Sequence, residues 1–184
     1  MKILSKEEFA IELNKIVTYG ASDIEIGIED MKIAARGDIY VTECLDLDSD
    51  DNSIILDIED INQITKNKDL LVMSTSECSG NNSAEKAIKL AILDFEKNNL
   101  LLKEADGILI YFQINSDYKM VEIAEAVDIV NIKCENDIIL EEPDIIWGIS
   151  CDNGLKNDYV KATVFIGFSK KGKYGNNYID KSVV

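Results

Sequence analysis

The pattern of apolar residues over positions 69–168 constrains the fold of this chain most strongly. Two segments, one between Asn82 and Asn98 and one at 117–134, repeat apolar residues at helical spacing on one face only. Apolar runs typical of strands flank them at 69–75, 107–114, 144–151 and 159–168. Helices with a single apolar stripe can bury only one side. The β-α-β-α-β-β order therefore predicts an α+β two-layer sandwich, a four-stranded sheet with both helices on one face.

The first 53 residues predict a small N-terminal α/β extension. Residues 5–17 have the apolar spacing of a helix, and Ser5 with Glu8 three positions later matches a capping box. Alternating isoleucines within 22–42 indicate one or two strands. The acidic stretch 43–53 is interpreted as a boundary loop.

Three further boundaries follow from local composition. Residues 54–66 predict a turn entering a short helix, and 54–168 as a whole predicts one domain. Asp152-Asn153-Gly154 has turn chemistry and predicts a hairpin-like connection between the last two strands. The polar and basic residues 169–184 predict a flexible tail.

The net charge argues against two classes of partner. Asp and Glu number 35 against 19 Lys and Arg, which leaves a formal charge of −16. Such a surface repels the phosphates of nucleic acids and of anionic membranes. No apolar run is long enough for a membrane-spanning helix, and the N-terminus does not resemble a signal peptide. We therefore expect a cytoplasmic protein with a protein partner.

Several catalytic chemistries are excluded by composition. The chain has no histidine, so Ser-His and Cys-His catalysis and histidine-ligated zinc are absent from it. Its cysteines form no CxxC pair, and we expect reduced thiols at Cys44, Cys78, Cys134 and Cys151. Cys78 lies in a predicted polar turn, 76–82, and we interpret it as an exposed, inert thiol. No cofactor is predicted.

Four ordered segments resemble the C-terminal domain of FtsZ, the bacterial cell-division GTPase of the tubulin superfamily. They are LLVMSTSECSGNNSAEKAIKLAI at 70–92, EADGILIYFQI at 104–114, MVEIAEAVDIV at 120–130 and DIIWGISCDNGLKNDYVKATVFIGF at 144–168. Each motif alone is weak, and their shared order carries the resemblance. It implies the same two-layer sandwich that the apolar pattern predicts.

The resemblance extends upstream to a loop that bears two acids. Residues 54–64, IILDIEDINQI, are similar to the family's synergy loop, and Asp57 and Asp60 fall on its two acidic positions. In the family this loop reaches the GTP of the adjacent subunit and helps to position the attacking water. Ile55 replaces the family's asparagine. The resemblance thus implies that Asp57 and Asp60 act in trans, whereas spacing alone also fits a solvated acidic face.

The family's nucleotide-binding domain has no counterpart in this sequence. Too few residues precede Asp57 to form it, and Gly20, Gly27 and Gly37 are isolated rather than gathered in a glycine-rich loop. Backbone amides of such a loop are what hold phosphates. We therefore do not expect an autonomous GTPase.

Three other features have simpler readings. Asp46, Asp48 and Asp50 with Asp57 imitate a calcium loop poorly, because Asp51 replaces its glycine, and we interpret them as an acidic linker. Residues 167–173 match the GxxxxGK phosphate-loop spacing, but Tyr174 replaces the Ser or Thr that binds magnesium. Trp147 lies in an apolar strand, which favours core packing.

Three functional hypotheses remain open. The first is a bacterial FtsZ-like cell-division or cytoskeletal fragment without enzymatic activity, which binds a filament-forming FtsZ/tubulin-like GTPase or itself. The second is a trans-activator of a partner's GTP hydrolysis through Asp57 and Asp60. The third is an unrelated acidic binding module with the same fold.

Overall fold

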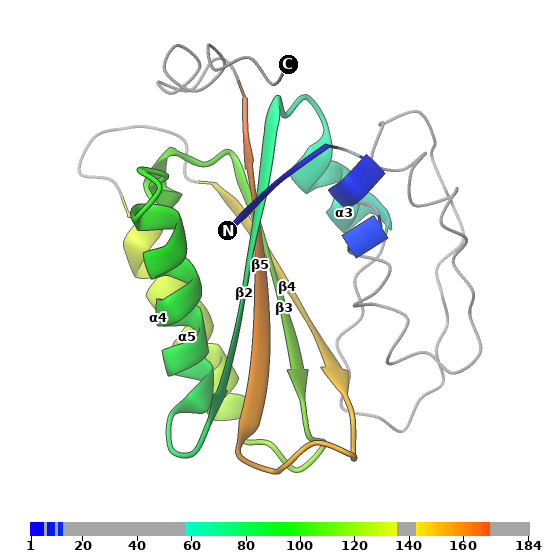
Figure 1. Ribbon diagram of the computed structural model, residues 1–184, viewed down its shortest axis with the longest axis vertical. Helices are drawn as coiled ribbons and strands as arrows, with labels where there is room; N and C mark the ends of the chain where they lie inside the picture. Colours follow the sequence, from blue (N-terminus) through cyan, green and yellow to red (C-terminus); the bar gives the residue numbers. More distant parts are fainter. Residues whose placement is uncertain (6, 10, 13–57, 136–142, 170–184) are drawn as a thin grey trace.

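The computed structural model describes residues 1–5, 7–9, 11–12, 58–135 and 143–169, which form a single sheet with helices on both faces (Figure 1). The strands are β1 (Lys2–Leu4), β2 (Leu70–Ser79), β3 (Gly107–Ile114), β4 (Asp144–Cys151) and β5 (Tyr159–Phe168). The helices are α3 (Ile58–Thr65), α4 (Ser83–Glu96), the short 3₁₀ helix η1 (Leu102–Glu104) and α5 (Met120–Cys134).

The strand order is β1-β2-β5-β3-β4, and only the β3–β4 pair is parallel. The four predicted strands therefore share one sheet. The predicted hairpin between β4 and β5 is wrong, because β3 lies between them. The predicted turn is nevertheless present, since Asp152 Oδ1 accepts a hydrogen bond of 2.8 Å from the Gly154 amide. β5 is buried along most of its length and pairs on both sides, which the central position provides.

A fifth strand comes from the N-terminus. Residues Lys2–Leu4 pair antiparallel with Leu71–Met73 of β2. The sequence does not predict this strand, because three residues are too few to establish an alternating pattern. Part of the predicted extension 1–53 is thus an edge strand of the main sheet. The expected strands within 22–42 and the basic tail 170–184 lie outside the described residues.

Helices α4 and α5 cover one face of the sheet, and α3 lies on the opposite face (Figure 1). The larger apolar cluster lies between the sheet and α4 and α5, and includes Ile88, Phe95, Phe112 and Val130. A smaller cluster on the other face contains Ile64 of α3. The prediction that both long helices share a face is confirmed. The structure adds a third layer, α3, which the two-layer prediction omits.

Strand β2 continues through the segment predicted as a polar turn. Two of its serines face α4: the Ser74 hydroxyl donates to Asp94 Oδ2 at 2.8 Å, and the Ser76 hydroxyl donates to the Ala87 carbonyl. Because these hydrogen bonds satisfy the two hydroxyl groups inside the structure, β2 can continue through polar residues. Cys78 consequently lies in β2 and is half-buried, not in an exposed turn.

The start of α4 is capped by a tyrosine from the segment that precedes α5. Asn82 adopts a left-handed conformation, with φ of 56°, and makes no side-chain capping bond. The Tyr118 hydroxyl instead accepts a 3.1 Å hydrogen bond from the Ala84 amide and lies 2.9 Å from the Ser83 hydroxyl. Tyr118 thereby ties the beginning of α4 to the segment that leads into α5.

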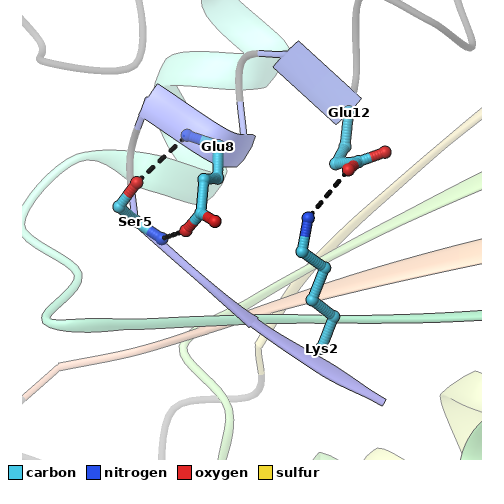
Figure 2. Close-up of polar contacts among 4 residues, drawn as sticks. All are labelled: Lys2, Ser5, Glu8 and Glu12. Atoms are coloured by element: carbon cyan, nitrogen blue, oxygen red, sulfur yellow. Dashed lines mark hydrogen bonds and ion pairs between the residues drawn. The ribbon is translucent and has the colours of Figure 1, made fainter. Parts of the chain in front are cut away.

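The predicted capping box at the N-terminus is confirmed (Figure 2). The Glu8 amide donates to Ser5 Oγ at 3.1 Å, and the Ser5 amide donates to the Glu8 carboxylate at 2.8 Å. Glu12, in the helical residues that follow, forms a 2.9 Å ion pair with Lys2 of β1. These contacts join the edge strand to the helical residues that follow it.

The capping box predicts a pH dependence of stability. The hydrogen bond from the Ser5 amide lowers the pKa of Glu8. Because the folded-state pKa is the lower one, the stabilisation is present above the unfolded-state pKa and is lost as pH falls through the folded-state value. We expect Glu8→Gln, which keeps an acceptor but removes the charge, to lower the thermal midpoint slightly at neutral pH and not in acid. Equal midpoints at neutral pH would contradict this assignment.

Candidate functional site

Helix α3 rests on a pair of glycines, which we call the glycine seat. Gly107 of β3 and Gly167 of β5 are direct partners across the sheet. A Cβ atom on Gly167 would lie 2.7 Å from the Ile64 carbonyl oxygen, and one on Gly107 would lie 3.0 Å from Ile64 Cδ1. Only glycine lets the helix backbone approach the strands this closely. Ile64 and Thr65 are fully buried as a result.

An apolar cluster surrounds this seat and holds α3 from the side. The rings of Phe9 and Phe165 meet edge to face, with centroids 4.9 Å apart and an interplanar angle of 66°. Phe9 comes from the helical residues that the capping box begins. The other buried members are Leu4, Ile64, Leu71, Leu109 and Tyr111. Four strands and one other helical segment therefore converge on the end of α3.

The chain leaves α3 through a defined turn. Asn67 adopts a left-handed conformation, with φ of 59°, a geometry that commonly ends helices. The Lys68 amide donates to the Thr65 carbonyl at 3.3 Å, and the Asp69 amide donates to the Phe168 carbonyl at 2.8 Å. The end of α3 is thus tied directly to β2 and β5.

Asp60 is the member of the predicted acidic pair that the structure describes. It lies four residues before Ile64, one helical turn from the glycine seat, and is half-buried. Asp57 lies outside the described residues, so the structure does not show the two carboxylates together. The arrangement sets a carboxylate on a helix whose far end is immobilised against the sheet.

The candidate metal ligands Asp46, Asp48 and Asp50 also lie outside the described residues. Within the described part of the chain, no three His, Cys, Asp or Glu side chains gather as a metal site would require. In the phosphate-loop-like segment 167–173, the structure describes Gly167–Ser169 only, and Gly167 packs against α3. Sequence reasoning missed this packing role, and the available signal was a glycine within an otherwise apolar strand.

The remaining residues singled out by the sequence have structural roles. Trp147 is half-buried and packs against the cluster beneath α4 and α5, which confirms its assignment to packing. The described cysteines, Cys78, Cys134 and Cys151, are thiols rather than disulfides, and the last two are buried. Among the described helices, none has the length and apolar character needed to cross a bilayer.

Comparison with solved structures defines the class of fold. A mutant FtsZ from M. jannaschii matches 64% of this chain and 33% of its own length, with a TM-score of 0.53 and 23% identity. The FtsZ from M. jannaschii described as an empty dimer matches 86% of this chain and 43% of its own length, with a TM-score of 0.50 and 22% identity. The chain therefore has the α+β fold of the FtsZ C-terminal domain.

Sequence comparison also finds similarity to FtsZ. The cell division protein FtsZ of Helicobacter pylori strain J99 is 23% identical over 123 residues, which cover 67% of this chain and 31% of that protein. No protein-family profile matches the sequence. The resemblance to the FtsZ/tubulin superfamily is confirmed: the chain is FtsZ-like. It spans about a third of the length of the curated relatives it matches.

The glycine seat predicts unequal effects of two alanine substitutions. Gly167→Ala places a methyl group against the Ile64 backbone, which only a shift of α3 can relieve, and we expect a loss of about 1–3 kcal/mol. Gly107→Ala meets the flexible end of the Ile64 side chain, and restricting the unfolded chain offsets part of its cost. Urea unfolding of both variants measures the difference. Equal stabilities, or the reverse order, would refute the seat.

Proposed function

We propose that this FtsZ-like chain is a non-enzymatic interaction module that binds a filament-forming FtsZ/tubulin-like GTPase through the surface around Asp57 and Asp60. The observation that carries the proposal is the placement of α3. This helix lies on the face opposite α4 and α5, and its end is locked on the glycine seat while Asp60 remains partly accessible. An acidic surface held on a rigid support suits a specific docking contact.

The charge of this surface indicates the chemistry of its partner. Two carboxylates near one helical turn suit a basic patch or a site that contains a magnesium ion, and they disfavour an anionic surface. One of the similar FtsZ structures is described as a dimer, so association between chains is on record for that protein. For this chain, either an FtsZ/tubulin-like GTPase or a second copy remains the expected partner, in the cytoplasm of a bacterium.

A second candidate function rests on the position of Asp60. It falls on an acidic position of the synergy-loop resemblance, which implies help to a neighbour's GTP hydrolysis. The chain would then supply Asp57 and Asp60 to nucleotide held by its partner. Addition of the chain to the partner should raise GTP turnover if this holds, and should leave turnover unchanged if the chain only docks.

We expect Asp57→Ala with Asp60→Ala to weaken binding to a partner recovered from the native host. Loss of two interface carboxylates should reduce affinity about tenfold, or about 1.4 kcal/mol. The thermal midpoint should stay within a few degrees of wild type, because accessible acids contribute little to stability. Calorimetry of the recovered complex measures the affinity.

The matched control places the same change on the opposite face of the sheet. Glu125 and Asp128 of α5 are exposed and have the same spacing of three residues. Glu125→Ala with Asp128→Ala should leave partner affinity unchanged. If the α3 double variant binds as tightly as wild type, or if both pairs weaken binding equally, the proposed docking surface is wrong.

We also expect the purified chain to bind neither GTP nor ATP by itself. The sequence has no glycine-rich loop, a single arginine and a charge of −16, all of which disfavour a triphosphate. Titration calorimetry with each nucleotide and magnesium checks this expectation. Micromolar binding by the chain alone would overturn the non-enzymatic proposal.

A further inference from the structure

The outer surface of α4 differs in charge from the rest of this acidic chain. Its exposed residues, with the lysine that follows the helix, are lysines and leucines only: Lys86, Lys89, Leu90, Leu93 and Lys97. We call these five residues the α4 stripe. Leu90 and Leu93 are 50% and 42% exposed, and they lie on adjacent turns with the lysines around them. An exposed apolar pair framed by cations is typical of a binding surface.

Two of the three acids of α4, Asp94 and Glu96, bond to residues outside the stripe, and only Glu85 pairs with one of its lysines. Glu96 pairs with Lys133 of α5 at 2.8 Å. Asp94 accepts a hydrogen bond from Ser74 and contacts the Met1 amino group. Glu85 pairs with Lys89, an exposed contact of the kind that contributes little and can be exchanged for a better partner.

The chemistry of the stripe selects an acidic segment that also carries leucines. The chain's own sequence contains one at 43–51, ECLDLDSDD, in which Leu45 and Leu47 alternate with Asp46 and Asp48. Its leucines match Leu90 and Leu93, and its carboxylates match the lysines of the stripe. We propose that the α4 stripe binds segment 43–51 of a second copy of this chain.

Overall charge does not prevent such a contact. At physiological ionic strength, charges more than about 8 Å apart are largely screened, so the local complementarity of the two surfaces decides. An anionic bilayer is a poorer occupant. It presents negative charge across its whole plane, and three lysines would have to overcome repulsion from a chain of charge −16. The contact proposed here involves neither α3 nor Asp60, so it is independent of the proposed docking function.

Sedimentation of the full chain over a range of concentrations tests the proposal. We expect reversible self-association that weakens as salt is added. Leu90→Glu with Leu93→Glu should weaken it by about tenfold or more, because the apolar centre of the contact is lost. The matched control is Val121→Glu with Ile132→Glu on α5, at positions that are 61% and 64% exposed, and it should associate as wild type does. Circular dichroism verifies that both variants are folded.

A mixing experiment separates contact between copies from contact within one chain. Asp46→Lys with Asp48→Lys reverses the charge of segment 43–51, and Leu90→Glu with Leu93→Glu removes the apolar centre of the stripe. Neither variant should self-associate, but an equimolar mixture should form a heterodimer through the one intact stripe and the one intact segment. Asp57→Ala with Asp60→Ala should leave self-association through the α4 stripe unchanged. Self-association that this variant abolishes would belong to the α3 docking surface and would overturn the stripe proposal.

Four other results would overturn the proposal. They are a wild-type chain that stays monomeric at every concentration, a mixture that forms no heterodimer, equal loss in the α5 control, and stripe-dependent binding to phosphatidylglycerol vesicles in place of self-association. The first two would place the segment elsewhere or within its own chain. The last would assign the stripe to a membrane surface.

Discussion

The contact of Ile64 with Gly107 and Gly167 organises one whole face of this molecule. Two adjacent strands present no side chain at the point where the helix backbone meets them, so α3 lies directly on the sheet. Phe9, Phe165 and Leu71 then close around Ile64, which recruits β1 and the N-terminal helical residues to the same face. Without that seat, the face opposite α4 and α5 would have to leave Leu109 and Tyr111 uncovered.

The two faces of the sheet carry different surface chemistry. The larger core lies between the sheet and helices α4 and α5, and the outer surface of α4 carries the lysines and leucines of the α4 stripe. The α3 face has the smaller core and presents Asp60. The central sheet, which both cores share, separates these two surfaces. The proposed docking surface at α3 and the proposed contact at α4 therefore lie on opposite faces of the sheet.

Much of this fold can be predicted from the sequence because the helices and strands of its core carry regular patterns of apolar residues. Apolar residues at helical spacing mark α4 and α5, and the mostly apolar runs of β3 and β5 mark strands buried on both faces. Periodicity does not report strand adjacency, so the insertion of β5 between β2 and β3 was missed. β1 was too short to show a pattern, and the serines of β2 imitated a turn while bonding to α4. The resemblance to FtsZ was what singled out Asp60. The local hint that Gly167 supports α3 was a glycine within an otherwise apolar strand, which does not by itself show what packs against it.

In the proposed function, α3 on its glycine seat forms the partner-facing surface of this FtsZ-like chain. Hydrogen–deuterium exchange of the full chain, with and without the filament-forming partner recovered from its host, would locate that surface. We expect slower exchange on binding at residues 57–65, with α5 unchanged. Protection confined to α4 and α5, or no protection at residues 57–65 in a complex that demonstrably forms, would contradict the proposed function.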